Sequence, residues 1–166
     1  MHPTVSTLVK RFDLKPHPEG GFYSESYRSA ETIPHKGLPD RFTGDRYYSS
    51  AIYFLLEKGN FSAFHRIKSD ECWHFYSGDP LWIHVLYPDG TCKTITLGNT
   101  EEAVFQFIVP AGCWFASETA PGGNFSLVGC TVAPAFDFAD FELANAEELI
   151  HDFPNHKDLI QRLCRS

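Results

Sequence analysis

The stretch that decides the fold is GNFSAFHRIKSDECWHFYSG, which runs from Gly59 to Gly78. Two runs rich in aromatic and aliphatic residues flank the polar segment Lys-Ser-Asp, which predicts one strand over residues 61–67 and a second over residues 71–77. Each run carries one side chain suited to chemistry, His65 on the first strand and Glu71 on the second. An imidazole and a carboxylate on neighbouring strands are candidates for acid–base catalysis or for holding a ligand.

Short strands separated by turn residues continue on both sides of this stretch. The predicted strands cover residues 20–28, 47–56, 61–67, 71–77, 81–87, 91–97, 103–109, 113–118 and 125–133. This spacing favours an all-β sandwich, jelly roll or barrel over βαβ units. Residues 29–46 show no periodicity and contain several prolines and glycines, so we expect a long loop or binding lid there.

Helical periodicity is confined to the two ends of the chain. Thr4 can cap a short helix over residues 4–13, and Asn145 with Glu148 forms a capping-box pattern. Asn155 is the predicted cap of the last helix, so the C-terminal helices cover about 145–164. With the barrel over about 20–134, the 166 residues are expected to form a single domain, 1–166.

Composition narrows the class of partner. Fourteen Lys and Arg face 21 Asp and Glu, a net charge of −7, and the basic residues are scattered, so we expect no nucleic-acid partner. No apolar run approaches the roughly 18 residues of a membrane span, and the segment MHPTVSTLVKRF lacks a signal-peptide core, so we expect a cytoplasmic protein without a membrane partner. Five cysteines without a C-x-x-C pair predict reduced core thiols.

Four segments carry a resemblance to a known family. The spacing of Gly59, His65, Glu71 and Gly78 is similar to the first motif of the cupin superfamily, and VPAGCWF (109–115) is similar to the second. HPEGGFYSESYR (17–28), SDECWHFYSGDPL (69–81) and APAFDFADFELA (133–144) resemble signatures of the cupin-5 branch, whose function is unknown. The resemblance implies a cupin-type double-stranded β-helix, or jelly-roll barrel, with minor helices. It also implies a homodimer and a pocket inside the barrel.

The resemblance also implies a metal centre of three imidazoles and one carboxylate, and this sequence departs from that pattern. Ile67 and Phe115 stand where two of the histidines belong, which leaves His65 and Glu71. Replacing imidazoles by hydrocarbon favours an organic ligand over an ion, so we expect no cofactor. Weak binding of a divalent metal by His65 and Glu71 is the alternative. His74 is the candidate third ligand, although strand alternation places it on the opposite face from Glu71.

A metal-free site is expected to use the same two residues in a pocket whose lining is otherwise apolar. His65 would act as base with Glu71 as its orienter, and Tyr23 as acid, with Tyr53 and Tyr76 as alternatives. Glu25 shares a strand face with Tyr23, whereas Arg28 is expected to point to the other side. The other predicted ligand-binding residues are Ile67, Trp73, His74, Phe75 and Phe115.

Three functional hypotheses follow from this pocket. The first is a metal-independent isomerase or epimerase acting on a carbohydrate-like or other polar carbonyl compound. The second is a binding module that holds a small organic molecule without turnover, and the third is a metal-dependent cupin enzyme with a reduced ligand set. The sequence does not decide whether any reaction is catalysed. A homodimer is expected because residues 47–56 are apolar on both strand faces.

Overall fold

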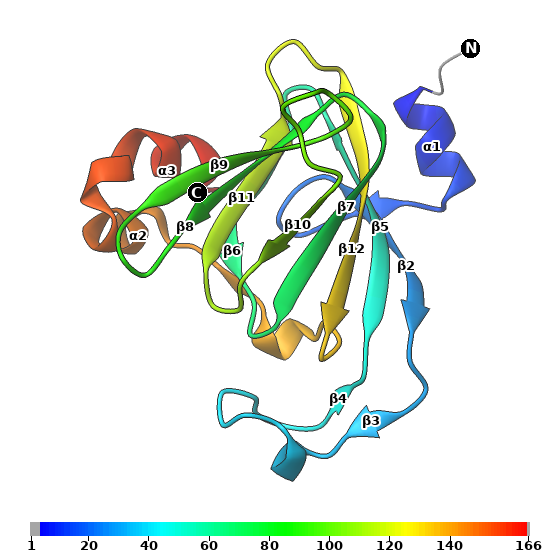
Figure 1. Ribbon diagram of the computed structural model, residues 1–166, viewed down its shortest axis with the longest axis vertical. Coiled ribbons are helices and arrows are strands. Elements are labelled where there is room, and N and C mark those ends of the chain that lie inside the picture. Colours follow the sequence, from blue (N-terminus) through cyan, green and yellow to red (C-terminus); the bar gives the residue numbers. More distant parts are fainter. Residues whose placement is uncertain (1–3, 166) are drawn as a thin grey trace.

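The strands form two facing antiparallel sheets in a jelly-roll arrangement, described for residues 4–165 by a computed structural model (Figure 1). The first sheet has six strands, in the spatial order β1 (Lys15–Pro16), β2 (Phe22–Arg28), β5 (Ser50–Glu57), β12 (Phe125–Ala133), β7 (Asp70–Gly78) and β10 (Gln106–Val109). The second has five, in the order β13 (Glu142–Leu143), β6 (Phe61–Arg66), β11 (Trp114–Thr119), β8 (Leu81–Leu86) and β9 (Cys92–Leu97). The predicted fold class, all-β with minor helices, is confirmed.

The main core lies between the two sheets. Phe54, Trp73 and Val128 from the first sheet pack against Val85 and Phe115 from the second, and all five are almost fully buried. Alternation along each strand sends one set of side chains into this layer and the other set outward. The aromatic-rich strand sequences therefore fill the interior of the jelly roll.

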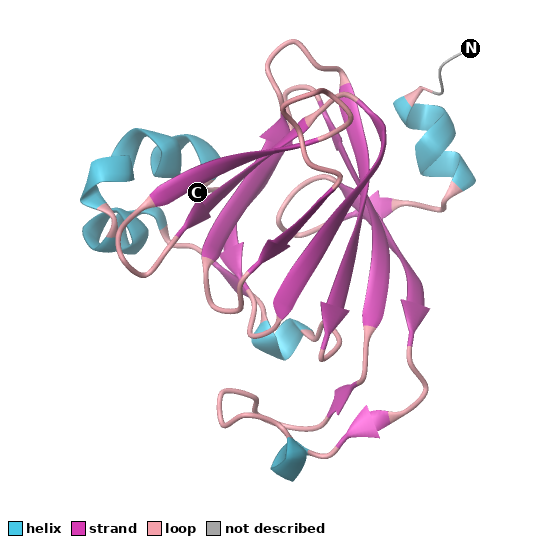
Figure 2. Ribbon diagram, viewed as in Figure 1, coloured by secondary structure: helices cyan, strands magenta, loops and turns pink. Residues whose placement is uncertain are grey.

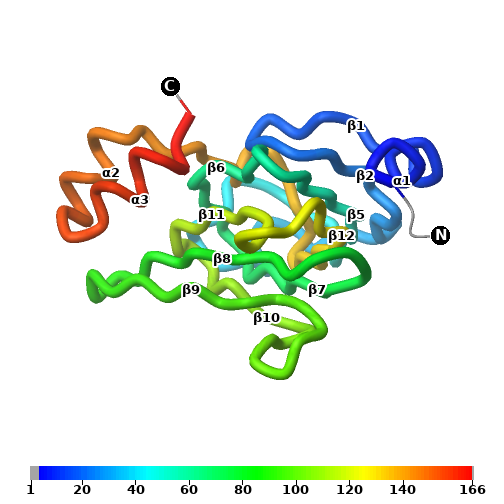
Figure 3. Tube along the Cα trace, turned by 90° about the horizontal axis from the view of Figure 1, so that it is seen from above, coloured from blue at the N-terminus to red at the C-terminus, as the bar shows by residue number. Residues whose placement is uncertain are grey.

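Within residues 4–165, three α-helices lie outside the sheets (Figure 2, where the short 3-10 turns are also cyan): α1 (Val5–Arg11), α2 (Ala146–Asp152) and α3 (Lys157–Leu163). As Figure 3 shows, α1 lies at one end of the molecule and the α2–α3 pair at the other. Ile160 and Leu163 of α3 join a second buried cluster that includes Phe64 of β6. The C-terminal helices are therefore packed against the outer face of the strand that carries His65.

The helix caps are partly as predicted. The hydroxyl of Thr4 accepts from the backbone N–H of Thr7, and the Asn145 side chain accepts from the N–H groups of the first turn of α2. The prediction that Asn155 caps the last helix is wrong. It lies inside a 3-10 turn, Pro154–His156, and α3 begins after that turn without a side-chain cap.

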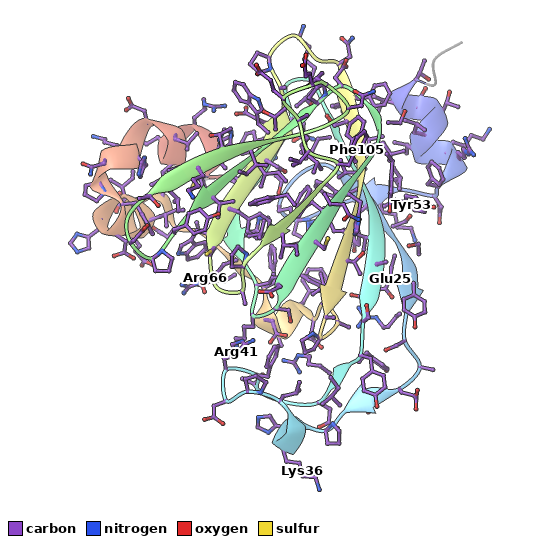
Figure 4. The ribbon with its side chains drawn as sticks, viewed as in Figure 1. Glu25, Lys36, Arg41, Tyr53, Arg66 and Phe105 are labelled. Carbon is purple, nitrogen blue, oxygen red and sulfur yellow. The ribbon has the colours of Figure 1, made fainter. Side chains whose placement is uncertain are left out.

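Residues 29–46 form the expected long connection, which extends from the body of the fold (Figure 1). It contains β3 (Thr32–Ile33), a 3-10 turn at His35–Gly37, and β4 (Arg46–Tyr47), which pairs with β3. Lys36 points away from the fold, whereas Arg41 points back toward it and donates from Nε to the Lys68 carbonyl at 2.7 Å (Figure 4). Arg46 anchors its end by donating from Nε and Nη2 to the two carboxylate oxygens of Asp140, both at 2.7 Å, in a buried ion pair.

Candidate functional site

A cavity of about 660 Å³ opens at one end of the jelly roll, where β6 and β12 end and β5 and β7 begin. Its deep part carries the titratable side chains of His17, Glu19, His65, Glu71 and Cys130. Its outer part carries a second group of charged residues, together with aromatic side chains from β2, β4 and the segment 136–138. The lining is therefore much more polar than the apolar pocket predicted from the sequence.

The turn between β1 and β2 places His17 and Glu19 in the cavity. It needs glycine at two successive positions, because Gly20 and Gly21 have φ values of +112° and +77°. The carbonyl of Glu19 accepts from Ala63 N–H on β6 (2.8 Å) and from Nε of Arg165 (3.1 Å). Contacts with two distant parts of the chain thus fix the backbone that carries the Glu19 carboxyl group.

His65 uses both ring nitrogens in buried contacts. Nδ1 lies 2.7 Å from the carbonyl oxygen of Ala63, which can only accept, so Nδ1 carries a proton. Nε2 lies 3.1 Å from Oε2 of Glu19, whose Oε1 accepts a hydrogen bond from Ser62 at 2.9 Å. Burial raises the pKa of Glu19 and lowers that of His65, so both shifts favour a neutral pair in which Glu19 donates to Nε2.

His17 lies on the other side of the Glu19 carboxyl group. Its Nδ1 is 3.6 Å from Oε2 of Glu19 and accepts a hydrogen bond from the Glu19 backbone N–H at 3.2 Å. Burial lowers the pKa of His17, which keeps the ring neutral with its proton on Nε2. Glu19 therefore lies between two imidazoles, of which only His65 is placed to exchange its proton.

Glu71 enters the same cavity from β7, in the sheet that faces His65. Burial raises its pKa to about 7, and the nearby charge of Glu19 acts in the same direction. The thiol of Cys130 interacts with the Glu71 carboxyl group, and burial raises the pKa of that thiol well above its usual range, so it remains protonated. Near neutral pH, Glu71 thus populates both the acid and the carboxylate form, which suits a group that accepts and returns a proton.

At the outer part of the cavity, Glu25 and Arg28 point to the same side of β2, contrary to the sequence prediction. Arg28 donates from Nε to Oε1 of Glu25 at 3.0 Å and from Nη2 to Oε2 at 2.8 Å. The register of β2 against β5 shifts between Glu25 and Tyr27, and this bulge inserts one residue into the alternation. The two side chains therefore meet within one strand.

Five of the residues predicted for the site line the cavity, namely His65, Glu71, Tyr23, Glu25 and Ile67. Glu71 is placed there as predicted, but the expectation that it orients His65 is wrong, because Glu19 holds that imidazole. Tyr23 packs with its ring edge against His17, with ring centroids 4.6 Å apart.

The other four predicted ligand-binding residues lie outside the cavity lining. Trp73 and Phe75 share the inward face with Glu71 but belong to the core, because each step of two residues moves about 7 Å further along β7. Phe115 packs against the ring of His65 from the core side, with centroids 4.1 Å apart. His74 points outward and contacts the Thr131 hydroxyl at 3.0 Å and the Gln106 amide at 3.1 Å.

Sequence reasoning missed His17 and Glu19. Both belong to the segment HPEGG, which enters the sequence analysis only as part of a family signature and not for its side chains. The available signal was the pair of consecutive glycines, which indicates a tight turn that could direct the preceding His17 and Glu19 side chains into a site. The contact with His65 joins residues 46 positions apart in the sequence, which local patterns do not reveal.

The residues present do not fit the metal centre that the family resemblance implies. Ile67 and Phe115 supply only hydrocarbon at two ligand positions, and both nitrogens of His65 are engaged by Ala63 and Glu19. Within residues 4–165, His, Cys, Asp and Glu side chains form no group of three arranged to hold a metal ion. The outward position of His74 also removes the candidate third ligand.

A jelly-roll barrel with a cavity at one end, lined in its deep part by histidine and glutamate, defines a cupin-like protein. The family model described as "Cupin superfamily (DUF985)" matches residues 6–144. The chain therefore belongs to this branch of the cupin superfamily.

Related proteins support this assignment along the whole chain. Protein SO0799 from Shewanella oneidensis is 41% identical, with a TM-score of 0.87 over 99% of both chains. A hypothetical protein from Leishmania major is 34% identical, with a TM-score of 0.89 over 99% of this chain and 100% of that one. The uncharacterised Saccharomyces cerevisiae protein YML079W is 28% identical over 87% of this chain and 77% of its own length. The helices of residues 4–165 are all too short or too polar to span a lipid bilayer.

Proposed function

We propose that the cavity binds a small polar carbonyl compound of carbohydrate-like type, and that the protein isomerises or epimerises it by proton transfer without a metal. The observation that carries the proposal is the 3.1 Å contact between Oε2 of Glu19 and Nε2 of His65, which lies in the same cavity as Glu71. The Glu19–His65 pair and the Glu71 carboxyl group thereby face the same cavity, with His65 and Glu71 on facing sheets. Acid–base groups on two sides of a ligand are what proton removal and return at carbon require.

The proposed reaction starts with the carboxylate form of Glu71. Its oxygen accepts the proton from the carbon next to the ligand carbonyl, and the electron pair of that C–H bond forms an enol whose oxygen takes a proton from Glu19. The negative charge thereby moves from Glu71 to Glu19, whose Oε1 keeps the hydrogen bond from Ser62, while His65, with its Nδ1–H bonded to Ala63, stays neutral and positions the Glu19 proton before the transfer. Glu71 then returns its proton to the former carbonyl carbon, and the hydroxyl group on the neighbouring carbon gives its proton to Glu19 as it becomes the new carbonyl, which completes the isomerisation and restores both acids.

Tyr23 and Ile67 complete the proposed ligand site. The phenol of Tyr23 supplies a hydroxyl in the lining, which suits it to orient a polar group of the ligand. The buried side chain of Ile67 supplies an apolar surface for the ligand's carbon skeleton. Hydrocarbon walls with a few convergent polar groups are typical of small-molecule pockets.

A thermal-shift screen against sugars, sugar phosphates, sugar nucleotides, amino acids and keto acids identifies the ligand. A ligand at 100 times its Kd stabilises the fold by about 2.7 kcal/mol. Incubation of each hit in D2O then measures proton exchange at carbon by NMR. We expect Glu71→Gln and His65→Asn to abolish exchange while binding persists, and the matched control His74→Asn, outside the cavity, to retain both.

The same experiment separates the alternatives. Binding without exchange in the unaltered protein would contradict catalysis and favour the binding module. The absence of a hit in every compound class would contradict the ligand site itself. A metal recovered at one equivalent per chain, and needed for exchange, would contradict the metal-free mechanism.

We also propose that the protein forms a homodimer through the outer face of the β7–β10 edge. Tyr76, Phe105 and Ile108 are 51%, 64% and 55% exposed there, which is unusual for large apolar side chains on one sheet edge (Figure 4 labels Phe105). The sequence argument placed the apolar surface on β5 instead, but Phe12 stacks on Tyr53 and covers part of that face. Sedimentation that detects only an 18.8 kDa species at micromolar concentration would contradict the dimer.

A further inference from the structure

The outer part of the cavity has an acidic balance of charge. Three carboxylates, from Asp13, Glu25 and Asp137, line it together with two cationic side chains, from Lys15 and Arg28. The two deeper acids add further negative charge whenever they ionise, whereas burial holds both cavity histidines toward the neutral form. The net charge of the cavity is therefore about −1 when Glu19 and Glu71 are both protonated, and about −3 when both are ionised.

Arg28 is not available as a receptor for an anion. Nε and Nη2 donate to the two oxygens of Glu25, and Nη2 also donates to the carbonyl of Phe136 at 3.0 Å. The charge of Asp137 acts on the same guanidinium group, which also lies 5.3 Å above the ring of Tyr47. Phosphate recognition uses arginine forks, lysine ammonium groups or backbone N–H groups directed at the ligand, and the lysine in this lining, Lys15, is exposed to solvent. The fork of Arg28 is directed at the protein's own oxygens instead.

We propose that this cavity selects neutral or positively charged small molecules and excludes phosphorylated and nucleotide-linked ones. The proposal rests on the cavity being the ligand site proposed above, and it names the substrate class of that site: unphosphorylated polar carbonyl compounds, including those that carry an amine. Tyr47, Phe136 and Phe138 provide aromatic faces in the lining that also suit an ammonium group.

The test uses a thiol introduced into the lining by Ser24→Cys, so it requires no knowledge of the ligand. Two methanethiosulfonate reagents with the same reactive group are compared, one with a trimethylammonium group and one with a sulfonate group. The thiolate attacks the sulfenyl sulfur and methanesulfinate leaves, and peptide-resolved mass spectrometry follows the modification at position 24 alone. The ratio of the two modification rates at position 24, cationic over anionic, is divided by the same ratio measured with free 2-mercaptoethanol. This division removes the difference in intrinsic reactivity between the two reagents.

We expect the cationic reagent to react about fivefold faster than the anionic one after this correction, and the ratio to fall toward one in about 1 M NaCl. Asp137→Asn keeps an oxygen that can accept from Ala139 N–H, and it should lower the ratio. The remote control Glu101→Gln should leave the ratio unchanged, which separates cavity charge from the net charge of the whole protein. Ile52→Cys provides a second position in the same lining if Ser24→Cys does not fold or react.

A corrected ratio of one or less would overturn the proposal. A ratio above one that responds equally to Asp137→Asn and Glu101→Gln would also overturn it, because the preference would then belong to the whole surface. The outcome is independent of turnover, so loss of the proposed isomerase activity leaves this test intact. Conversely, proton exchange on a sugar phosphate would support the proposed reaction and contradict the charge selection.

Discussion

Replacing Glu71 by Gln should make the protein more stable at neutral and alkaline pH. The folded chain raises the pKa of this carboxyl group from 4.5 to about 7, so the fold binds a proton that the unfolded chain releases between these values. Stability therefore falls as pH rises through this window and levels off above about 7. At about 1.4 kcal/mol for each pKa unit, ionisation of Glu71 costs the fold about 3 kcal/mol at pH 8. Gln cannot ionise and avoids this cost.

The assay is urea unfolding of both proteins between about pH 4.5 and about pH 8.5, with the remote variant Glu101→Gln as control. The two free energies of unfolding should agree at the acid end, and the advantage of Glu71→Gln should grow to about 3 kcal/mol at the alkaline end, or about 10 °C in Tm. The control should follow the unaltered protein throughout. Parallel curves for Glu71→Gln and the unaltered protein would refute the argument that Glu71 is buried and protonated.

Three further predictions concern the ion pair of Arg46, the turn at Gly20 and the carboxylate of Glu118. Arg46→Ala should cost about 3–5 kcal/mol in urea unfolding because it leaves the buried carboxylate of Asp140 with only the more distant Lys68 ammonium group, at 3.9 Å, and Arg46→Met combined with Asp140→Leu should recover most of this loss. Gly20→Ala should cost at least about 2 kcal/mol and shift the imidazole 15N signals of His65, because an added Cβ would collide with the Phe61 carbonyl; an unchanged spectrum would contradict this placement of Glu19. Burial alone would raise the pKa of Glu118, but hydrogen bonds from His84 and Arg162 outweigh it and lower the pKa to about 2. The Glu118 carboxylate therefore stabilises the fold above about pH 4.5, and this stabilisation is lost as the pH falls through about 2. Because its carboxylate is partly exposed, Glu118→Gln should cost only about 1–2 kcal/mol at pH 7, with no difference near pH 2.

Alternation of apolar residues predicted most of the fold. The strand 71–77 corresponds to β7, where burial on one face leaves a period-two signal, and the strand 125–133 corresponds to β12, where an almost continuous run of buried residues stands between turns. The motif spacing that resembles the cupin family placed Glu71 and Ile67 at the site, and both line the cavity. A period of two identifies the face of a strand, however, and not the depth along it, so it assigned Trp73 to the ligand site although it fills the core.

The remaining differences arise from interactions that the local sequence does not encode. The bulge in β2 reverses the face of Arg28, and one inserted residue leaves no mark in a seven-residue strand. The position of Glu19 against His65 depends on the turn at Gly20 and on pairing between the turn and β6. Such contacts are set by the packing of the whole barrel.

Arg165 links the C-terminal helices to the backbone that carries Glu19, the partner of His65. It follows α3 and donates to the carbonyls of both Glu19 and Phe61, while α3 itself packs against Phe64, next to His65 in sequence. Fraying of α3 would release one of the anchors of Glu19 and lengthen the path its proton travels to the imidazole. Local unfolding at one end of the molecule would thereby alter acid–base chemistry inside the barrel. Amide hydrogen exchange along α3 should therefore report how often the contact between Glu19 and His65 is disturbed.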